Sequence, residues 1–379
     1  QPFQQALHGA LGKRRSLFLY PPALIYSLIT AFRNYLYNSG LLDSTEFRVP
    51  VICVGNITVG GTGKTPHVEY LVELLRKDYR IAVLSRGYRR RSSGFQIASP
   101  NSHTSDIGDE PLQIALKFPD IVVAVDNNRV NGIKNLLDHN PDIDVVILDD
   151  GFQHRKIKPG ISILLSDFNQ PMHDDFILPY GNLRESIENT QRADIVIITK
   201  VPHDIRSEEM QKIAGNLNKI FRKKVFFTSL SYEIPVKLFE SSIVRKSETD
   251  TDNSDETGAV VITGIASPET FIRFVQNRYN KTIHLNFPDH HYFTVKDVRK
   301  IISAYESLKT SHRIVVTTEK DSVRLKELTD IPDHIKKAIY YIPVRIDFLA
   351  GEKNKFDNII IEYVRKNKPD NGISQVERN

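Results

Sequence analysis

A glycine-rich segment at residues 55–65 carries the residue types that bind phosphate. It follows the apolar run Val51–Val54 and reads GNITVGGTGKT, with Thr58 where the strict P-loop pattern has glycine. Glycines let backbone N–H groups turn toward a phosphate chain, and a helix that follows the loop adds its positive end. The lysine of such a loop reaches the β- and γ-phosphates, and the last hydroxyl coordinates Mg²⁺. The predicted nucleotide-binding residues are Gly60, Gly61, Thr62, Gly63, Lys64 and Thr65.

Two adjacent carboxylates stand at a second position suited to phosphate chemistry. Asp149 and Asp150 directly follow the apolar run Val145–Leu148. Carboxylates at the carboxyl end of a buried strand lie where the ligand crevice of an open α/β sheet forms, and such a pair can hold a metal directly and through water. An aspartate at a strand end also often serves only as a turn or cap residue. For the nearby His154, contact with substrate, orientation of Asp149 and a structural hydrogen bond all remain open.

These residues need a sheet that brings several strand ends together. From Val49 onward, short runs rich in Val and Ile alternate with helix-length segments. Strands of this composition, without polar alternation, predict a parallel sheet covered by helices on both faces. The fold class is therefore predicted to be α/β, of the P-loop NTPase type. The strands assigned to this sheet are Val49–Val54, Ile81–Leu84, Ile121–Val125, Val145–Leu148, Ile161–Leu165 and Ile195–Ile198.

A polar, acidic stretch at residues 247–257 interrupts this rhythm and is too hydrophilic to bury. The runs Ala259–Thr263, Ile314–Thr318 and Ala338–Pro343 then predict a smaller α/β unit. The expected organisation is an N-terminal membrane-associated helix at 1–45, a P-loop domain at 46–233, a linker at 234–257, a smaller α/β domain at 258–366 and a polar tail at 367–379.

The bulk composition is that of a globular protein of about two domains, with 379 residues of which 40% are hydrophobic and 26% charged. The single Cys53 excludes an internal disulfide framework and favours a reducing compartment. A net charge of +5 suits anionic lipids or phosphorylated substrates. The basic residues are scattered and form no stripe interleaved with aromatic residues, so nucleic acid is not an expected partner.

A run without charged residues extends from Ser16 to Phe32, with basic residues before it and tyrosines after it. It is at the short limit for a membrane span, which needs roughly 20 apolar residues. Pro21 and Pro22 interrupt the run, and no Ala-x-Ala cleavage site follows closely, which disfavours a signal peptide. We expect an interfacial helix at residues 22–37 that lies on a membrane surface. The alternative is a helix buried against the first domain.

The residues at one predicted strand end indicate which nucleotide base the protein binds. Guanine-specific P-loop proteins usually read the base with Asn-Lys-x-Asp, whereas the comparable position here reads Thr199-Lys200-Val201-Pro202. ATP is therefore favoured over GTP. A nucleotide-switch protein, either a GTPase or a metal-insertion chaperone, remains the main alternative, and a carboxylate-activating ligase is another.

Seven short motifs follow one another along the chain: Val54–Pro66, Ser85–Tyr88, Gly108–Pro111, Leu148–Arg155, Leu178–Glu185, Phe287–His291 and Thr318–Asp321. Each alone is modest, but their order along the chain is highly specific. Taken together, they resemble the tetraacyldisaccharide 4'-kinase family of lipid A biosynthesis. Arg89 departs from the small residue expected after Arg-Gly-Tyr, and Tyr180 and Asn182 vary the usual Pro-x-Gly-Pro run.

The resemblance implies transfer of the ATP γ-phosphoryl group to the 4'-hydroxyl of a tetraacyldisaccharide 1-phosphate, which gives lipid IVA. It implies Asp109 as the catalytic base and His290 as its partner, with His291 as the alternative. Glu110 is expected to join Asp149 and Asp150 around Mg²⁺. Asp109 and Glu110 also suit a purely structural helix start.

The remaining expected substrate or phosphate contacts are Asn56, Arg86, His154 and Arg184. Arg184 suits a bidentate phosphate clamp, although a surface ion pair is its structural alternative. The expected cofactors are ATP and Mg²⁺, and the expected partners are an acylated disaccharide lipid and the membrane surface. No obligate protein partner is evident from the sequence. The implied location is the cytoplasmic face of the bacterial inner membrane.

Overall fold

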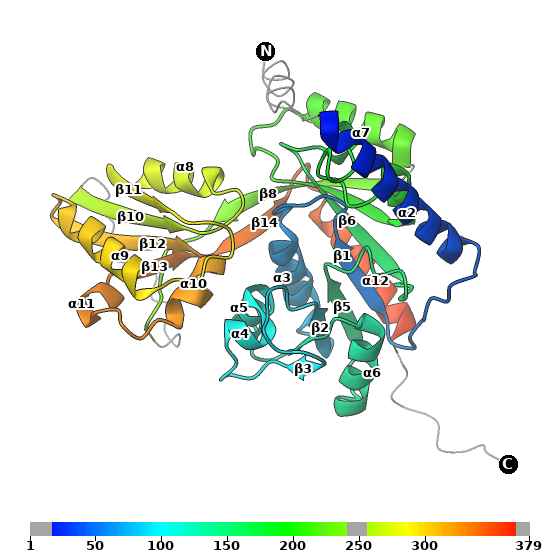
Figure 1. The fold of residues 1–379 in the computed structure, drawn as a ribbon, viewed down its shortest axis with the longest axis horizontal. Coiled ribbons are helices and arrows are strands. Elements are labelled where there is room, and N and C mark those ends of the chain that lie inside the picture. Colours follow the sequence, from blue (N-terminus) through cyan, green and yellow to red (C-terminus); the bar gives the residue numbers. More distant parts are fainter. Residues whose placement is uncertain (1–16, 222, 241–255, 369–379) are drawn as a thin grey trace.

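The computed structural model describes residues 17–221, 223–240 and 256–368 and shows two units, each built on one sheet (Figure 1). The larger unit contains a nine-stranded sheet in the order β14-β8-β7-β6-β1-β5-β2-β4-β3 within these residues. Its strands pair in parallel except for the β8–β14 and β3–β4 pairs. The strands are β1 (Val51–Gly55), β2 (Ile81–Ser85), β3 (Gln96–Ile97), β4 (Val122–Val125), β5 (Val145–Asp149), β6 (Ile161–Asp167), β7 (Ile195–Thr199), β8 (Lys224–Tyr232) and β14 (Val344–Phe348).

Helices cover both faces of this sheet, as the runs of Val and Ile predict. On one face, Val68, Ile114 and Phe356 from three helices pack on strand residues such as Ile52. On the other face, further helices pack on the alternate strand residues. The first set is α3 (Lys64–Leu75), α5 (Asp109–Lys117) and α12 (Lys353–Asn367), and the second is α6 (Arg129–His139) and α7 (Ser207–Phe221). A short α4 (Thr104–Ile107) precedes α5, and the 3-10 turns are Leu17–Leu19, Met172–Asp174 and Ile187–Arg192.

The smaller unit is a second α/β layer with the strand order β11-β10-β12-β13-β9 among the described residues. Its strands are parallel except for β9, which is antiparallel to β13. Its strands are β9 (Val236–Lys237), β10 (Thr257–Thr263), β11 (Lys281–Asn286), β12 (His312–Thr318) and β13 (Ile339–Ile342). Its helices are α8 (Glu269–Arg278), α9 (Val295–Ser307), α10 (Glu319–Lys326) and α11 (Asp333–Lys336). The predicted α/β class is confirmed for both units.

The chain passes between the units twice, along β8 and β14, which lie between them in Figure 1. After β13 the chain returns to the larger sheet, where β14 pairs with β8 and α12 packs on the core. The predicted grouping of residues 258–366 in one smaller domain is therefore corrected at its end. In sequence, residues 344–367 continue the alternation of strands and helices seen before them. Only the pairing of β14 with β8 and the packing of α12 assign them to the larger unit. Most of the predicted linker and most of the polar tail lie outside the described residues.

The N-terminal segment forms α2 (Tyr20–Asn38), with prolines at its first turn. Only Ala23 and Asn34 of this helix are buried, whereas Leu24, Ile25, Leu28, Ile29 and Phe32 are exposed. Within the described residues, no helix is long and apolar enough to cross a membrane. The helix lies along the edge of the larger unit (Figure 1), so it is not the buried core helix that was the alternative expectation.

Candidate active site

The phosphate loop joins β1 to α3 at the carboxyl edge of the larger sheet. β1 lies between β5 and β6, so loops from three neighbouring strand ends meet there. Gly63 precedes α3 with a φ of 81°, a left-handed conformation that favours glycine. Lys64 is the first residue of the helix, and its Nζ lies 3.7 Å from Asp150 Oδ1. The loop therefore points its cation toward the carboxylates at the end of β5.

Asn56 is buried inside this loop. Its Nδ2 donates a hydrogen bond to Thr62 Oγ1 at 2.9 Å and lies 3.4 Å from Thr58 Oγ1. Thr199 Oγ1 donates to the carbonyl of Thr62 at 3.0 Å. These contacts fix the loop from beneath, and they give Thr58 a part in the variant pattern. The substrate contact of Asn56 stays a prediction, and the packing of this side chain supports a role in holding the loop.

Asp149 and Asp150 occupy different electrostatic environments although they are neighbours. Burial, together with Glu110 and Asp150, raises the pKa of Asp149 to about 7. Burial acts in the same direction on Asp150, but the charges of Lys64 and Arg184 outweigh it and hold the pKa of that carboxyl below its ordinary value. Asp150 Oδ1 forms the ion pair with Lys64, whereas the Oδ1 of Asp149 is buried and accepts no hydrogen bond from the described residues. Unpartnered acceptors of this kind are suited to a cation.

The four predicted magnesium ligands are only partly brought together. No group of three His, Cys, Asp or Glu side chains among the described residues forms a metal site alone. Mg²⁺ in kinase sites is usually bound by one or two carboxylates together with phosphate oxygens and water. The free Oδ1 of Asp149 fits this arrangement, whereas Glu110 accepts a hydrogen bond from Lys320 at 3.1 Å.

The predicted catalytic pair is in contact across the two units. His290 Nδ1 lies 2.8 Å from Asp109 Oδ2, although 181 positions separate the two residues in the chain. Burial opposes the charge of Asp109, but the hydrogen bond with His290 and the charge of Lys320 outweigh burial and lower the pKa of this carboxyl to about 2. Asp109 is therefore an ionised acceptor at neutral pH.

Both members of the pair are held by unusual backbone. Asp109 begins α5 directly after Gly108, whose φ is 90° and where a Cβ would lie 3.0 Å from the carbonyl of Tyr88. His290 itself has a φ of 59°, and its N–H donates to the carbonyl of Gly264 at 3.1 Å. A non-glycine residue in this conformation is strained and needs surrounding support.

His291 faces away from Asp109. Its Nε2 lies 3.0 Å from Asp297 Oδ2, and its ring stacks on Phe287. Asp297 also caps α9, because it accepts hydrogen bonds from Thr294. The structure therefore brings His290 to Asp109, and it places His291 against Asp297 at the start of α9.

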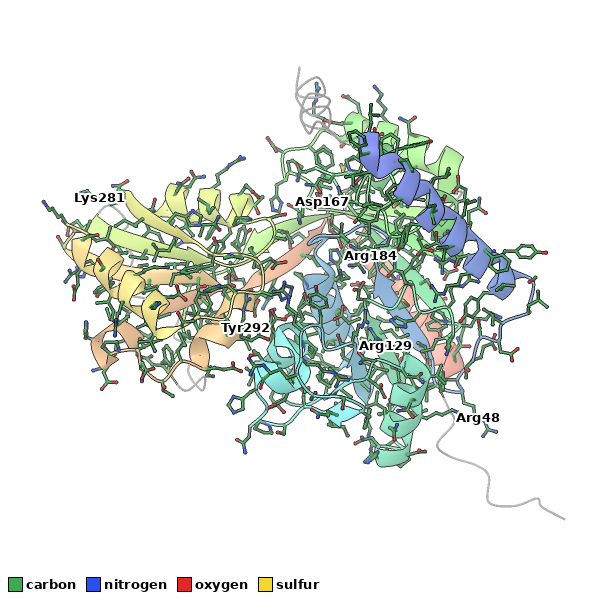
Figure 2. The ribbon with its side chains drawn as sticks, in the orientation of Figure 1. Arg48, Arg129, Asp167, Arg184, Lys281 and Tyr292 are labelled. Carbon is green, nitrogen blue, oxygen red and sulfur yellow. The ribbon has the colours of Figure 1, made fainter. Side chains whose placement is uncertain are left out.

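The remaining predicted contacts lie around the same strand ends. Arg184 Nη1 donates to Asp150 Oδ2 at 3.2 Å, while Arg86 is exposed at the end of β2. Burial and the charges of Arg129 and Arg86 lower the pKa of His154 to about 4, so this imidazole is neutral. Figure 2 shows Arg129 and Arg184 in the larger unit and Tyr292 on the side of the smaller unit that faces it.

Three further cations, Arg129, Lys320 and Arg324, lie at the site. Arg129 is buried at the start of α6 after β4. The negative charges of Asp149 and Asp150 stabilise its positively charged form. Lys320 and Arg324 come from α10 of the smaller unit and approach Asp109. Arg129 follows a strand end, which is a usable sequence signal. Lys320 lies in the Thr318–Asp321 motif, which gave no indication of its partner, and Arg324 lies outside the seven motifs.

Comparison with known proteins agrees with these features. The sequence profile of the tetraacyldisaccharide-1-P 4'-kinase family matches residues 15–365. A tetraacyldisaccharide 4'-kinase of Bacteroides thetaiotaomicron is 43% identical over 368 residues, covering 95% of this chain and 96% of that protein. A protein of the same name from Porphyromonas gingivalis is 38% identical and covers 94% of this chain and 99% of its own length.

A solved structure is similar over nearly the whole fold. The structure of LpxK from Aquifex aeolicus in complex with ATP superposes with a TM-score of 0.68 at 28% identity. The match covers 91% of this chain and 98% of that one. With the family profile and relatives of about 40% identity over almost their full lengths, the chain belongs to the tetraacyldisaccharide 4'-kinase family.

Proposed function

We propose that this chain is an ATP-dependent kinase that phosphorylates the 4'-hydroxyl of tetraacyldisaccharide 1-phosphate and so forms lipid IVA. The observation that carries the proposal is the contact between Asp109 and His290, because Glu110, next to Asp109, and Lys64 of the phosphate loop both act electrostatically on Asp149. Family membership and the ATP complex of the Aquifex aeolicus relative support the same reaction.

In this reaction the 4'-oxygen forms a bond to the γ-phosphorus while the bond between that phosphorus and the departing ADP oxygen breaks. An alcohol is a poor nucleophile, so a base that receives its proton lowers the barrier. Asp109 is the proposed acceptor of this proton, and His290 holds the carboxylate in position through their 2.8 Å contact. Lys64 is suited to stabilise charge on the β- and γ-phosphates.

Magnesium would supply charge neutralisation on the transferred phosphoryl group. Asp149, with its unpartnered Oδ1, and Thr65, at the start of α3, are the residues proposed to hold it. Asp150 is proposed to keep Lys64 and Arg184 aligned, because it forms an ion pair with each of these two side chains.

We further propose that the chain works at a membrane surface through α2, at the cytoplasmic face of the inner membrane. Contiguous exposed apolar side chains on one helix are typical of a membrane or protein contact. Phe32 and Leu28 are 64% and 63% exposed, and an acylated substrate resides in a bilayer. The predicted basic anchors at residues 13–15 lie outside the described residues.

The test is transfer of labelled γ-phosphate from ATP to tetraacyldisaccharide 1-phosphate in mixed micelles, comparing wild type with Asp109→Asn. We expect labelled lipid with wild type and a loss of about 100-fold or more with the variant, because the proton acceptor is removed. Both proteins should have the same circular dichroism spectrum and bind ATP. Hydrolysis of ATP or GTP by wild type, without labelled lipid at any detergent ratio, would contradict the proposal and favour a nucleotide switch.

A further inference from the structure

The smaller unit places a lysine, Lys320, against the catalytic pair. Lys320 is the second residue of α10, and its side chain is only 21% exposed. Its Nζ lies 3.2 Å from His290 Nε2 and 3.1 Å from Glu110 Oε1. The carboxylate of Asp289 is 3.8 Å away. The ammonium group is therefore surrounded by acceptors from both units.

The contact with Lys320 favours one of the two neutral forms of His290. Nε2 lies 3.2 Å from Lys320 Nζ and, at the longer distance of 3.6 Å, faces Asp289 Oδ2. An ammonium group has three donors and no acceptor, so the imidazole nitrogen that faces Lys320 must accept and must be unprotonated. A neutral imidazole then carries its proton on the other nitrogen. In His290 that nitrogen is Nδ1, which faces Asp109 Oδ2 at 2.8 Å. The proton therefore lies where it can be donated to the carboxylate.

We propose that Lys320 is a positioning residue that holds His290 in the tautomer with its proton on Nδ1, and so orients Asp109 toward the acceptor hydroxyl. The inference deepens the proposed kinase function and rests on it. A wrong tautomer would leave a lone pair facing the carboxylate, which would repel it instead of orienting it. Because Lys320 belongs to the smaller unit, the pair is oriented only when α10 is docked on α5.

A second ion pair at the same helix contact provides a matched control. Lys117 of α5 lies 2.8 Å from Glu319, the residue next to Lys320, and 2.7 Å from Glu69. Lys117 joins the two units as Lys320 does, but its hydrogen bonds and ion pairs within the described residues are with Glu69 and Glu319 and not with His290 or Asp109. Loss of Lys117 therefore weakens docking of α10 and leaves the donor to His290 in place.

The first measurement is the nitrogen NMR spectrum of wild-type protein labelled in histidine, with the His290 signals assigned by their loss in His290→Gln. We expect Nδ1 protonated and Nε2 unprotonated. This measurement needs no substrate and no variant of Lys320. A signal showing the proton on Nε2 in the wild-type protein would overturn the inference.

The second measurement compares Lys320→Met, Lys320→Arg and Lys117→Met in the same spectrum and in the lipid kinase assay. Lys320→Met removes the donor, so we expect the His290 tautomer to change, kcat to fall about 100-fold and the KM for ATP to stay within about twofold. Lys320→Arg retains a donor and should recover the Nδ1 tautomer and a large part of kcat. Lys117→Met should keep the tautomer and lower the melting temperature.

The outcomes separate the two proposals. An unchanged tautomer and kcat in folded Lys320→Met overturns the role of Lys320 while the kinase function stands. Equal losses in Lys320→Met and Lys117→Met, with the tautomer retained in both, would also overturn it, since docking alone would explain them. Absence of labelled lipid with wild type overturns the proposed function, and the spectrum then still reports the tautomer.

Discussion

At the scale of single residues, the site depends on residues whose backbone has a conformation that non-glycine residues rarely adopt. Asp150 and His290 both have positive φ values, 51° and 59°, and neither is glycine. Arg89, with a φ of 61°, donates from Nη1 to the carbonyls of Asp289 and His290 at 3.1 and 3.3 Å. The residue that departs from the family pattern thus supports the loop that carries His290. Strained backbone is maintained where surrounding contacts determine it.

The two adjacent histidines give the sharpest prediction at this scale. We expect His290→Ala to lower kcat for lipid phosphorylation about 100-fold, because Asp109 loses its hydrogen-bond partner. His291→Ala should retain most of kcat and instead lower the free energy of unfolding by about 1–3 kcal/mol, since Asp297 loses a partner. Steady-state kinetics and urea denaturation measure both quantities. Equal kinetic losses in the two folded variants would contradict the assignment.

At the scale of elements, α3, α5 and α10 meet in a buried ionic cluster behind the catalytic pair. Glu69 of α3 accepts hydrogen bonds from Gln113 and Lys117 at 2.7 Å each. Lys117 also pairs with Glu319 of α10. The helix that begins at the phosphate loop is therefore connected to the smaller unit by one lysine between two carboxylates. Breaking such a pair by removing one partner is costly, because a buried charge is left uncompensated.

This cluster predicts a specific dependence of stability on pH. Burial and the charge of Glu319 outweigh Lys117 and raise the pKa of Glu69 to about 7, above the usual 4.5. The folded state then binds the proton more tightly than the unfolded state, so the contribution of Glu69 to stability falls as pH rises from about 4.5 to about 7.

We expect Glu69→Gln to remove the loss of stability that Glu69 causes as the pH rises. Relative to wild type, the variant should gain about 1–3 kcal/mol in the free energy of unfolding between pH 5 and pH 8. Urea denaturation at both pH values measures the difference. Glu73→Gln, on the exposed side of the same helix, is the control and should show no such gain. A constant difference between wild type and Glu69→Gln across this range would contradict the raised pKa.

At the scale of the whole molecule, the active site lies where two sheets meet. β8 and β14 join the units, and the return of the chain to the larger sheet means that both crossings lie side by side. Asp109 and the phosphate loop come from one unit, whereas His290, Lys320 and Arg324 come from the other. The proposed catalytic arrangement is therefore complete only with the units in contact, and such contact would limit access of water to the phosphoryl group.

The exposed face of α2 gives a prediction for the molecule as a whole. We expect Ile25→Glu/Ile29→Glu to reduce binding to vesicles of acidic phospholipids about tenfold or more. Each isoleucine side chain is at least 60% exposed, so a glutamate in its place would put a charge into the apolar part of the membrane. Activity on a water-soluble analogue of the acceptor should be retained. Vesicle sedimentation measures the binding.

The matching control places the same charges elsewhere on the larger unit. Ile97→Glu/Leu116→Glu alters two other exposed apolar side chains and should bind vesicles as wild type does. Equal binding of the α2 variant and wild type would refute membrane attachment through this face. A fall in the melting temperature of the α2 variant would show that the face packs on protein instead.

The sequence by itself determined the parts of this protein that depend on local pattern. Runs of Val and Ile report burial on both faces of a strand, and the glycines of the phosphate loop report a backbone requirement, so the α/β class and the nucleotide site could be predicted. Carboxylates at strand ends follow from the same rule, which is how Asp149 and Asp150 were identified. The catalytic pair came from the family motifs and not from spacing.

Only the tertiary structure decided which of these residues meet. Asp109 and His290 are 181 positions apart, and the family motif favoured His290 over His291 without showing that it contacts Asp109. The hydrogen bond from Asn56 Nδ2 to Thr62 Oγ1, which supports a role of Asn56 in holding the loop, was likewise not predicted from the sequence. The return of β14 and α12 to the larger sheet and the approach of Lys320 to the pair depend on how two sheets dock. Docking is set by complementary surfaces from distant segments, which local periodicity does not encode.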